Sequence, residues 1–420
     1  MMATRTVHSS AISGAITAPA SKSYAQRALA ASLLSNGTSI LRNPSRSDDS
    51  LAAMDVIQAL GASLEDFGDR LIIHGGLSQV RSTLDFGEAG LGIRLFSSIA
   101  ALQPYPVYLT GTGSLARRPM HIIEEALIPL GVSCETDNGL LPIRIQGPLQ
   151  GGTITIDGSL SSQVLTGLLL ALPRAPEDSV IRVKQLKSKP YIDMTLEIMK
   201  VFGVKVDNDN YIEFRIAGNQ NYRPVEYQVE GDWSGAAFML VSGAIGGRVS
   251  VGGLNTSSLQ ADRKIMEALE SAGANINIKD NYIDIERNKL KGFDFDATHC
   301  PDLFPPLLSL AAHCSGKSII KGADRLLHKE SNRAAALESE MSKLGVDVSF
   351  RRDRMVVKGP ATIKGNMVDS HNDHRIAMAA ATIVLPARDQ EVIIKGSECV
   401  AKSYPSFFED LKHIGGIVNE

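Results

Sequence analysis

The chain has 420 residues, 44% of them hydrophobic and 21% charged, and its net charge is −3 at pH 7. This length suits two domains rather than a single core, and the charge lacks the basic excess of nucleic-acid binders. No apolar run reaches membrane-spanning length, and the first ten residues lack a signal-peptide core. We therefore expect a cytoplasmic protein without nucleic-acid or membrane partners.

The first element in chain order is the stretch "APASKSYAQRALAASLLSNG", residues 18–37. It predicts a helix that is apolar nearly all round but has a polar start at Ser21, Lys22 and Ser23. A helix of this kind belongs inside a layer, covered by other elements. The strand-like "GTSILRNP" follows, and an amphipathic helix then ends at "IQALGASLE".

The same order of elements returns five more times. Helix-like segments end in a glycine that precedes a strand at spacings of 70, 72, 70, 72 and 70 residues. These glycines are Gly61, Gly131, Gly203, Gly273, Gly345 and Gly415. Each fits the left-handed position just past a helix end. The period predicts six related units of about 70 residues.

Each unit also has a polar loop that opens an apolar helix. The N–H groups and macrodipole of a helix N-terminus favour anions, so six such starts predict a binding site for polyanionic ligands. Cationic and hydroxyl side chains that suit phosphate or carboxylate stand in or between these loops. The ordinary alternatives are that Ser21, Ser161 and Ser162 are plain N-caps, that Asp302 caps its own helix, and that Lys329 and Glu330 are exposed charges.

Several motifs then resemble the 5-enolpyruvylshikimate-3-phosphate synthase family of enolpyruvyl transferases. They are "SKSYAQRAL", "GEAGLGIR", "RRPM", "SLSSQVLTGLLLAL", "SKPYIDMTL", "VEGDWSGAAF", "HKESNR", "NDHRIAM" and "AKSYPSFFEDL". They occur in the family's order and span nearly the whole chain.

The resemblance implies an α/β fold, an inside-out α/β barrel of two domains with three repeats each, helices inside and sheets outside. The implied domains are residues 20–230, and residues 1–19 together with 231–420, with the active site in the cleft between them. The implied reaction transfers the enolpyruvyl group of phosphoenolpyruvate to the 5-hydroxyl of shikimate 3-phosphate and releases phosphate. This reaction belongs to chorismate and aromatic amino-acid biosynthesis and needs no metal or organic cofactor. We also expect a cytoplasmic monomer.

Roles carry over motif by motif. The residues implied to bind shikimate 3-phosphate are Lys22, Ser23, Arg27, Ser161, Ser162, Gln163, Ser188, Asp302 and Lys329. Those implied to bind phosphoenolpyruvate are Lys22, Gly90, Arg118, Gln163, Arg333, Arg375 and Lys402. The implied catalytic residues are Asp302, which accepts the hydroxyl proton, Glu330, which serves the methylene carbon, Lys22 and His374.

Some positions depart from the family's pattern, and alternatives stay open. Glu88 replaces a usual Asn beside the expected anion, so we expect a cationic partner for it, with Arg94 and Arg325 as candidates. The alternative functions are a UDP-N-acetylglucosamine enolpyruvyl transferase and a non-catalytic anion-binding relative. The first usually has a reactive Cys in the loop that here reads "GTGSLARRP", and the second need not keep Asp302 and Glu330.

The cysteines are scattered and form no CxxC pair. We therefore expect free thiols and no zinc site. They are Cys134, Cys300, Cys314 and Cys399.

Overall fold

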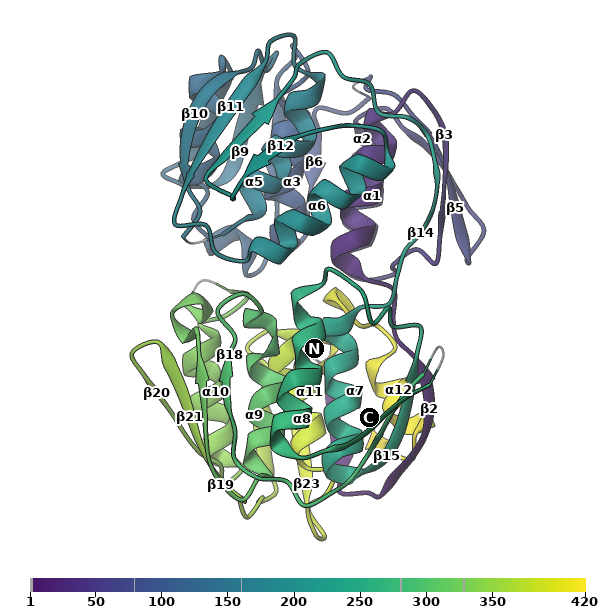
Figure 1. Ribbon diagram of the computed structural model, residues 1–420, viewed down its shortest axis with the longest axis vertical. Helices are drawn as coiled ribbons and strands as arrows, with labels where there is room; N and C mark the ends of the chain where they lie inside the picture. The colour runs from purple at the N-terminus through teal and green to yellow at the C-terminus, as the bar shows by residue number, and fades with distance from the viewer. Residues whose placement is uncertain (1–2, 79, 160, 280–281, 328) are drawn as a thin grey trace. The chain divides into compact units, whose positions relative to one another are not determined.

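The computed structural model describes residues 3–78, 80–159, 161–279, 282–327 and 329–420 (Figure 1). Contacts divide the chain into two compact units. The first unit is residues 20–230, and the second unit is residues 1–19 together with 231–420. Within the described residues, each unit has three four-stranded sheets, in which one edge strand pairs parallel to its neighbour and the other pairs are antiparallel.

The sheets of the first unit follow one pattern of strand order. The first sheet is β14 (Glu226–Gln228), β3 (Gly37–Arg42), β5 (Arg70–Gly75) and β4 (Ser63–Asp66). The second is β6 (Thr83–Asp85), β7 (Val107–Thr110), β9 (Leu140–Gln146) and β8 (Ser133–Asp137). The third is β10 (Gly152–Asp157), β11 (Ser179–Lys184), β13 (Glu213–Ile216) and β12 (Asp207–Asp209).

The second unit repeats this pattern. Its first sheet is β16 (Asn275–Lys279), β17 (Tyr282–Glu286), β15 (Gly247–Gly252) and β2 (Ile12–Thr17). Its second is β18 (Asp294–Asp296), β19 (Gly316–Lys321), β21 (Arg354–Gly359) and β20 (Asp347–Arg351). Its third is β22 (Asn366–Asp369), β23 (Glu391–Lys395), β1 (Thr4–His8) and β24 (Ile417–Asn419), so the N-terminal strand completes the C-terminal sheet.

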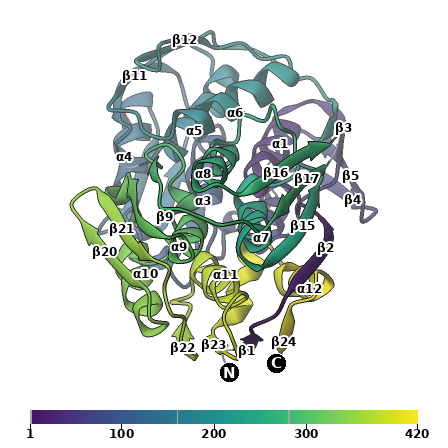
Figure 2. The ribbon, with the colours of Figure 1, turned by 60° about the horizontal axis from the view of Figure 1, so that its bottom comes forward.

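The helices form two classes, as the apolar patterns predict. Those that are buried almost all round are α1 (Lys22–Leu34), α3 (Gly90–Ala100) and α5 (Gln163–Ala171), and in the second unit α7 (Trp233–Gly246), α9 (Phe304–Ala312) and α11 (His374–Ile383). The amphipathic ones are α2 (Asp48–Ala59), α4 (His121–Leu127), α6 (Lys189–Val201), α8 (Ile265–Ala272), α10 (Arg333–Lys343) and α12 (Phe407–His413). In Figure 2, α7, α9 and α11 lie inside the strands of the second unit and pack against one another. In the second unit these three helices are therefore inside and the sheets outside them.

The recurring glycines behave as predicted. All six have positive φ, from 83° at Gly203 to 116° at Gly61. The four cysteines are buried and free, so the prediction of free thiols is confirmed. No helix in the described part of the chain is long and apolar enough to cross a membrane.

A partly buried histidine makes the stability of the second unit sensitive to acid. His313 follows α9, and its Nε2 lies 2.9 Å from the Ile383 carbonyl oxygen at the end of α11. Burial lowers the pKa of His313 from 6.5 to about 4. The unfolded chain therefore takes up this proton first, and the stabilisation present above pH 6.5 is lost as the pH falls toward 4. The loss is at most about 3 kcal/mol.

We expect His313→Gln to lose less stability than the unsubstituted protein between pH 7 and pH 4.5, because it removes the group that takes up this proton. Urea unfolding at both pH values measures the difference, with His413→Gln as the matched control, because His413 is exposed at the end of α12. An equal loss of stability in the His313→Gln variant and the unsubstituted protein contradicts the assignment.

Candidate active site

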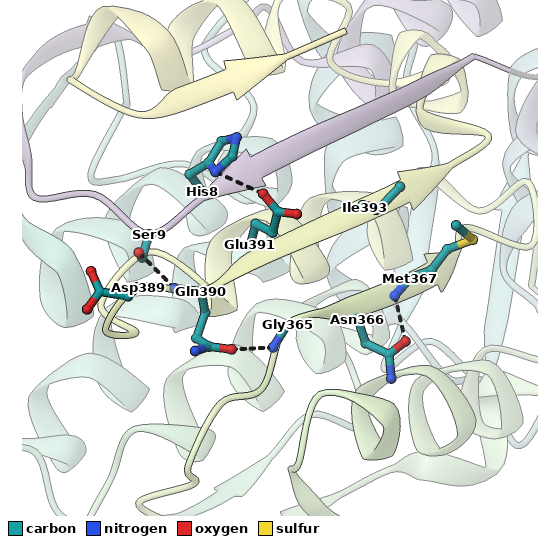
Figure 3. A pocket seen from close by; sticks show the side chains of 9 residues that line it. All are labelled: His8, Ser9, Gly365, Asn366, Met367, Asp389, Gln390, Glu391 and Ile393. Carbon is teal, nitrogen blue, oxygen red and sulfur yellow. Dashed lines mark hydrogen bonds and ion pairs between the residues drawn. The ribbon is translucent and has the colours of Figure 1, made fainter.

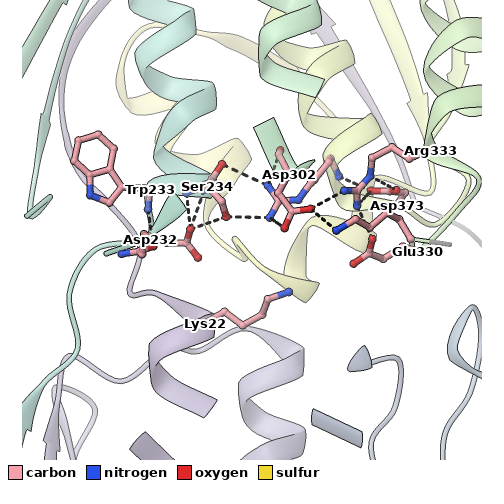
Figure 4. Close-up of polar contacts among 12 residues, drawn as sticks. Lys22, Asp232, Trp233, Ser234, Asp302, Glu330, Arg333 and Asp373 are labelled. Atoms are coloured by element: carbon pink, nitrogen blue, oxygen red, sulfur yellow. Dashed lines mark hydrogen bonds and ion pairs between the residues drawn. The ribbon is translucent and has the colours of Figure 1, made fainter. Parts of the chain in front are cut away.

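The polar cluster of the second unit is centred on Asp302, in a short 3-10 turn just before α9 (Figure 4). Its Oδ1 lies 3.2 Å from Lys329 Nζ and 2.8 Å from Arg333 Nη1, and its Oδ2 lies 3.3 Å from Arg375 Nη2. Burial alone favours the protonated acid, but the three cations outweigh it and hold the pKa of Asp302 well below its ordinary value. Asp302 is therefore an ionised acceptor among cations, not a helix cap.

Arg333 connects this carboxylate to two others. It is the first residue of α10, and its side chain is 0% exposed. Nη2 donates to Glu330, and Nε donates to Asp373 Oδ2 at 2.9 Å. Although burial disfavours its charge, the three surrounding carboxylates raise the pKa of Arg333. One guanidinium thus sets the relative positions of Asp302, Glu330 and Asp373.

Arg375 extends the cluster to the start of α7. It is the second residue of α11, and its Nη2 donates to Ser234 Oγ at 2.9 Å. Ser234 Oγ donates in turn to Asp232 at 2.6 Å, and Asp232 caps α7 by accepting from the Ser234 and Gly235 N–H groups. Asp373 caps α11 in the same way, through the Arg375 N–H. The helix starts predicted from the repeat therefore orient the arginines.

Two further predicted residues lie near the start of α11. Lys402 is buried and donates through Nζ to the Asn372 carbonyl oxygen at 2.8 Å. His374 is the first residue of α11 and is also buried.

Lys329 and Glu330 are each about a fifth exposed and ion-paired, so the alternative that they are ordinary surface charges is wrong.

In the first unit, the start of α1 holds three of the predicted residues. Lys22 Nζ lies 2.8 Å from Asp49 Oδ2 on α2, and both side chains are mostly buried. Arg27 is buried, and its Nε donates to Thr195 Oγ1 on α6 at 2.9 Å. Its Nη1 donates to the Ser23 carbonyl oxygen at 2.7 Å. The Ser21 side chain accepts from Tyr24 N–H, so this serine is an N-cap as the ordinary alternative held.

A second group joins α3, α5 and the segment after β7. Arg94 Nη1 lies 3.1 Å from the Gly90 carbonyl oxygen and 3.2 Å from Gln163 Oε1, and Nη2 lies 3.2 Å from the Pro119 carbonyl oxygen. A Cβ added to Gly90 would lie 2.1 Å from Arg118 Nη1. The structure therefore brings together three residues predicted to bind phosphoenolpyruvate.

The serines predicted at the other helix starts differ from one another. Ser161 Oγ accepts from Gln163 N–H at 3.1 Å, and Ser162 precedes α5 without a side-chain capping bond. Ser188 is buried at the start of α6 with φ 56° and ψ 41°, a left-handed conformation that a non-glycine residue seldom adopts.

The acidic departure Glu88 has a backbone partner. Its Oε2 accepts from Ser114 N–H at 2.8 Å. The bonds that Arg94 makes to Gly90, Gln163 and Pro119 give that arginine other acceptors. This contact pairs Glu88 with a backbone amide, and a cationic partner for Glu88 stays a prediction.

A separate pocket lies on β1, β22 and β23 of the second unit (Figure 3). Its lining includes His8, Asn366 and Glu391, and His8 Nδ1 lies 3.2 Å from Glu391 Oε2. It contains none of the predicted site residues. Among the residues that the structure describes, no group of three or more His, Cys, Asp or Glu side chains is placed to hold a metal ion.

Sequence reasoning missed several supporting residues. Asp49, Thr195 and Ser234 each bond a predicted cation, but none stands out by residue type. Asp232 and Asp373 were not missed, because both occupy the repeat position of Ser21 at a helix start.

Comparison with known proteins agrees with this architecture. A family model described as EPSP synthase (3-phosphoshikimate 1-carboxyvinyltransferase) matches residues 7–411. The chain is 39% identical, over 97% of both chains, to a 3-phosphoshikimate 1-carboxyvinyltransferase of Clostridium perfringens. It is 38% identical to the protein of that name from Clostridium kluyveri, over 97% of this chain and 96% of the relative.

Solved structures show the same fold. EPSP synthase from Acinetobacter baumannii superposes with a TM-score of 0.85 at 27% identity, over 99% of this chain and 100% of the other. The enolpyruvyl transferase NikO from Streptomyces tendae is 15% identical with a TM-score of 0.80, over 99% of this chain and 98% of the other, and supports the fold alone. The predicted α/β class is confirmed, and the chain belongs to the EPSP synthase (3-phosphoshikimate 1-carboxyvinyltransferase) family.

Proposed function

We propose that the protein transfers the enolpyruvyl group of phosphoenolpyruvate to the 5-hydroxyl of shikimate 3-phosphate and releases phosphate. The observation that carries this proposal, beside membership of the family, is the ionised Asp302 held among Lys329, Arg333 and Arg375. Such a group combines a proton acceptor with cations for anionic substrates, as the reaction requires. A UDP-sugar acceptor is not favoured, because the relatives and the family model carry the shikimate name.

Shikimate 3-phosphate is the ligand we assign to hydroxyl and cationic groups of both units. In the first unit these are Lys22, Ser23, Arg27, Ser161, Ser162, Gln163 and Ser188, and in the second Asp302 and Lys329. Hydroxyl donors and a planar guanidinium suit its phosphate and carboxylate groups. The fixed position of Arg27, with donors already directed to Thr195 and Ser23, supports a site formed before substrate binds.

Phosphoenolpyruvate is assigned mainly to buried cations. In the first unit the residues are Lys22, Gly90, Arg118 and Gln163, and in the second Arg333, Arg375 and Lys402. The short approach of Gly90 to Arg118 supports this pairing, because a Cβ at position 90 would displace the guanidinium from its present place. Both sets of residues would serve one pair of substrates.

The first chemical requirement is a base for the attacking hydroxyl. In the proposed step, the 5-oxygen bonds to the central carbon of the enol while its proton passes to Asp302. In the free protein three cations depress the pKa of Asp302. Substrate phosphate and carboxylate groups that bind these cations would weaken that effect and make Asp302 more basic when both substrates are present.

The second requirement concerns the methylene carbon and the leaving group. The methylene carbon gains a proton in the addition step and loses one when phosphate leaves. We assign both transfers to Glu330, which Arg333 holds in position, and we place His374 among the catalytic residues. Lys22 and the arginines would balance the growing charge on phosphate. We further propose that the protein needs no metal or cofactor and acts as a cytoplasmic monomer.

An assay of phosphate release tests the reaction. We expect phosphate to be released from phosphoenolpyruvate only when shikimate 3-phosphate is also present, because the hydroxyl acceptor is part of the reaction. The matched control replaces shikimate 3-phosphate with UDP-N-acetylglucosamine. Release with the UDP-sugar but not with shikimate 3-phosphate would reject the proposal.

A further inference from the structure

The segment from the last residue of β22 to the start of α11, residues 369–373 and called the loop below, connects several groups of the proposed phosphoenolpyruvate site. Its Asn372 carbonyl oxygen accepts from Lys402, and its Asp373 carboxylate accepts from Arg333. The loop then leads directly into Arg375. Its backbone path therefore fixes where three of the proposed binding cations lie.

The loop has an unfavourable backbone. His371 has φ 51° and Asn372 has φ 57°, so two successive non-glycine residues are left-handed. Such residues persist only where the surrounding structure holds them, because each raises the energy of the folded chain. Contacts outside the loop must supply this constraint.

Glu340 supplies two contacts of this kind. Its side chain is 2% exposed, and its Oε2 accepts from Asp369 N–H at 2.9 Å. Its Oε1 lies 3.0 Å from His371 Nε2. Asp369 Oδ1 then accepts from His371 N–H at 2.7 Å, which closes the turn. One buried carboxylate thus holds both the first and the third residue of the loop.

Glu340 and Arg333 lie seven residues apart on α10, about two helical turns, so both face the same side of the helix. Arg333 holds the last residue of the loop through Asp373. Lys343 Nζ lies 2.6 Å from Glu340 Oε2 and contributes to a lowered pKa of Glu340, although burial acts in the opposite direction. Glu340 is therefore an ionised carboxylate that contacts the loop from the same face of α10 as Arg333.

We propose that Glu340 and His371 are positioning residues for phosphoenolpyruvate: together they hold the strained loop so that Lys402, Arg333 and Arg375 meet the substrate. They touch the loop and α10, and they act through the cations. This role rests on the function proposed above, and it concerns the binding of phosphoenolpyruvate rather than the binding of shikimate 3-phosphate.

The kinetic test compares Glu340→Gln, His371→Gln and the double variant. We expect each single change to raise KM for phosphoenolpyruvate by roughly tenfold and to leave KM for shikimate 3-phosphate within about twofold. The double variant should be no worse than about the larger single effect, because both side chains serve one contact. Lys343→Gln is the matched control: it contacts the same carboxylate but not the loop, and it should leave both KM values within about twofold.

Hydrogen exchange tests the same idea without an activity assay. Amide hydrogens of residues 369–373 should exchange about tenfold faster or more in Glu340→Gln than in the unsubstituted protein or in Lys343→Gln. Unchanged exchange overturns the positioning role whether or not the proposed reaction holds. If the unsubstituted protein is active, two kinetic results also overturn the positioning role. One is an equal change in the KM values for both substrates, and the other is an unchanged KM for phosphoenolpyruvate. An inactive unsubstituted protein rejects the proposed function instead, and the exchange result still decides the role of Glu340 in the loop.

Discussion

Asp302→Asn should lower the turnover number by about a thousandfold while leaving the binding of shikimate 3-phosphate largely intact. The amide keeps the shape of the carboxylate, but it cannot take the hydroxyl proton. Arg333 and Arg375 donate to different oxygens of Asp302, so the single oxygen of the amide keeps only one of these two bonds. The loss should therefore fall on turnover rather than on substrate binding. Steady-state phosphate release gives the turnover, and calorimetric titration gives the affinity.

The matched control for this prediction is Asp296→Asn. Asp296 lies on β18 in the same unit and forms an exposed ion pair with Lys321. The control should keep the turnover of the unsubstituted protein. Turnover within tenfold of the unsubstituted value in Asp302→Asn, with the protein folded, would remove Asp302 from the role of base.

Replacing Arg333 should produce the largest loss of stability. Arg333→Gln leaves Asp302, Glu330 and Asp373 without the guanidinium that all three share. Removing one partner of a buried ion pair typically lowers the free energy of unfolding by about 3–5 kcal/mol. We expect a decrease of this size at pH 7.5, measured by urea unfolding, together with loss of phosphoenolpyruvate binding.

The pH dependence of this loss has a definite sign. With Arg333 present, the lowered pKa of Asp302 stabilises the folded protein above its unfolded pKa, and this is lost as the pH falls. In Arg333→Gln, the crowded carboxylates should have raised pKa values, so their penalty grows as the pH rises. The difference in stability between the two proteins should therefore be larger at pH 7.5 than at pH 4.5, because the carboxylates of the variant take up protons over this range. The contribution of Asp302 itself is lost only below about pH 3.8.

Arg388→Gln is the control, because the Arg388 side chain is 97% exposed and its contact to Asp389 is a long surface one at 3.8 Å. It should change the free energy of unfolding by less than about 0.5 kcal/mol. A decrease below about 1 kcal/mol in Arg333→Gln, or an equal decrease at both pH values, would contradict the shared-guanidinium account.

The repeat allowed most of the fold to be predicted. A glycine every 70 or 72 residues marks a helix end, and an apolar helix after a polar loop marks an inner helix; both follow from local backbone geometry and burial. The position of β1 between β23 and β24 depends instead on pairing between the two ends of the chain. No local pattern encodes such a pairing, and only the family resemblance indicated it.

Some residues of the candidate site could likewise be predicted from the sequence, and others could not. Helix starts and charged residue types drew attention to Asp302, Arg333 and Arg375. The single side chains that hold them in place, such as Ser234 and Glu340, were not recognised. Their importance comes from distances across different helices, and a serine or glutamate within an ordinary helix has no distinguishing sequence pattern.

The completion of the C-terminal sheet by β1 has a consequence for synthesis on the ribosome. The first unit is one uninterrupted segment, residues 20–230, so all of its strands have emerged while the rest of the chain is still being translated. β1 emerges before the whole first unit but pairs with β23 and β24, which are made after it. The nascent chain must therefore keep β1 unpaired in that sheet until β23 and β24 have been made, by which time the first unit has already had time to fold.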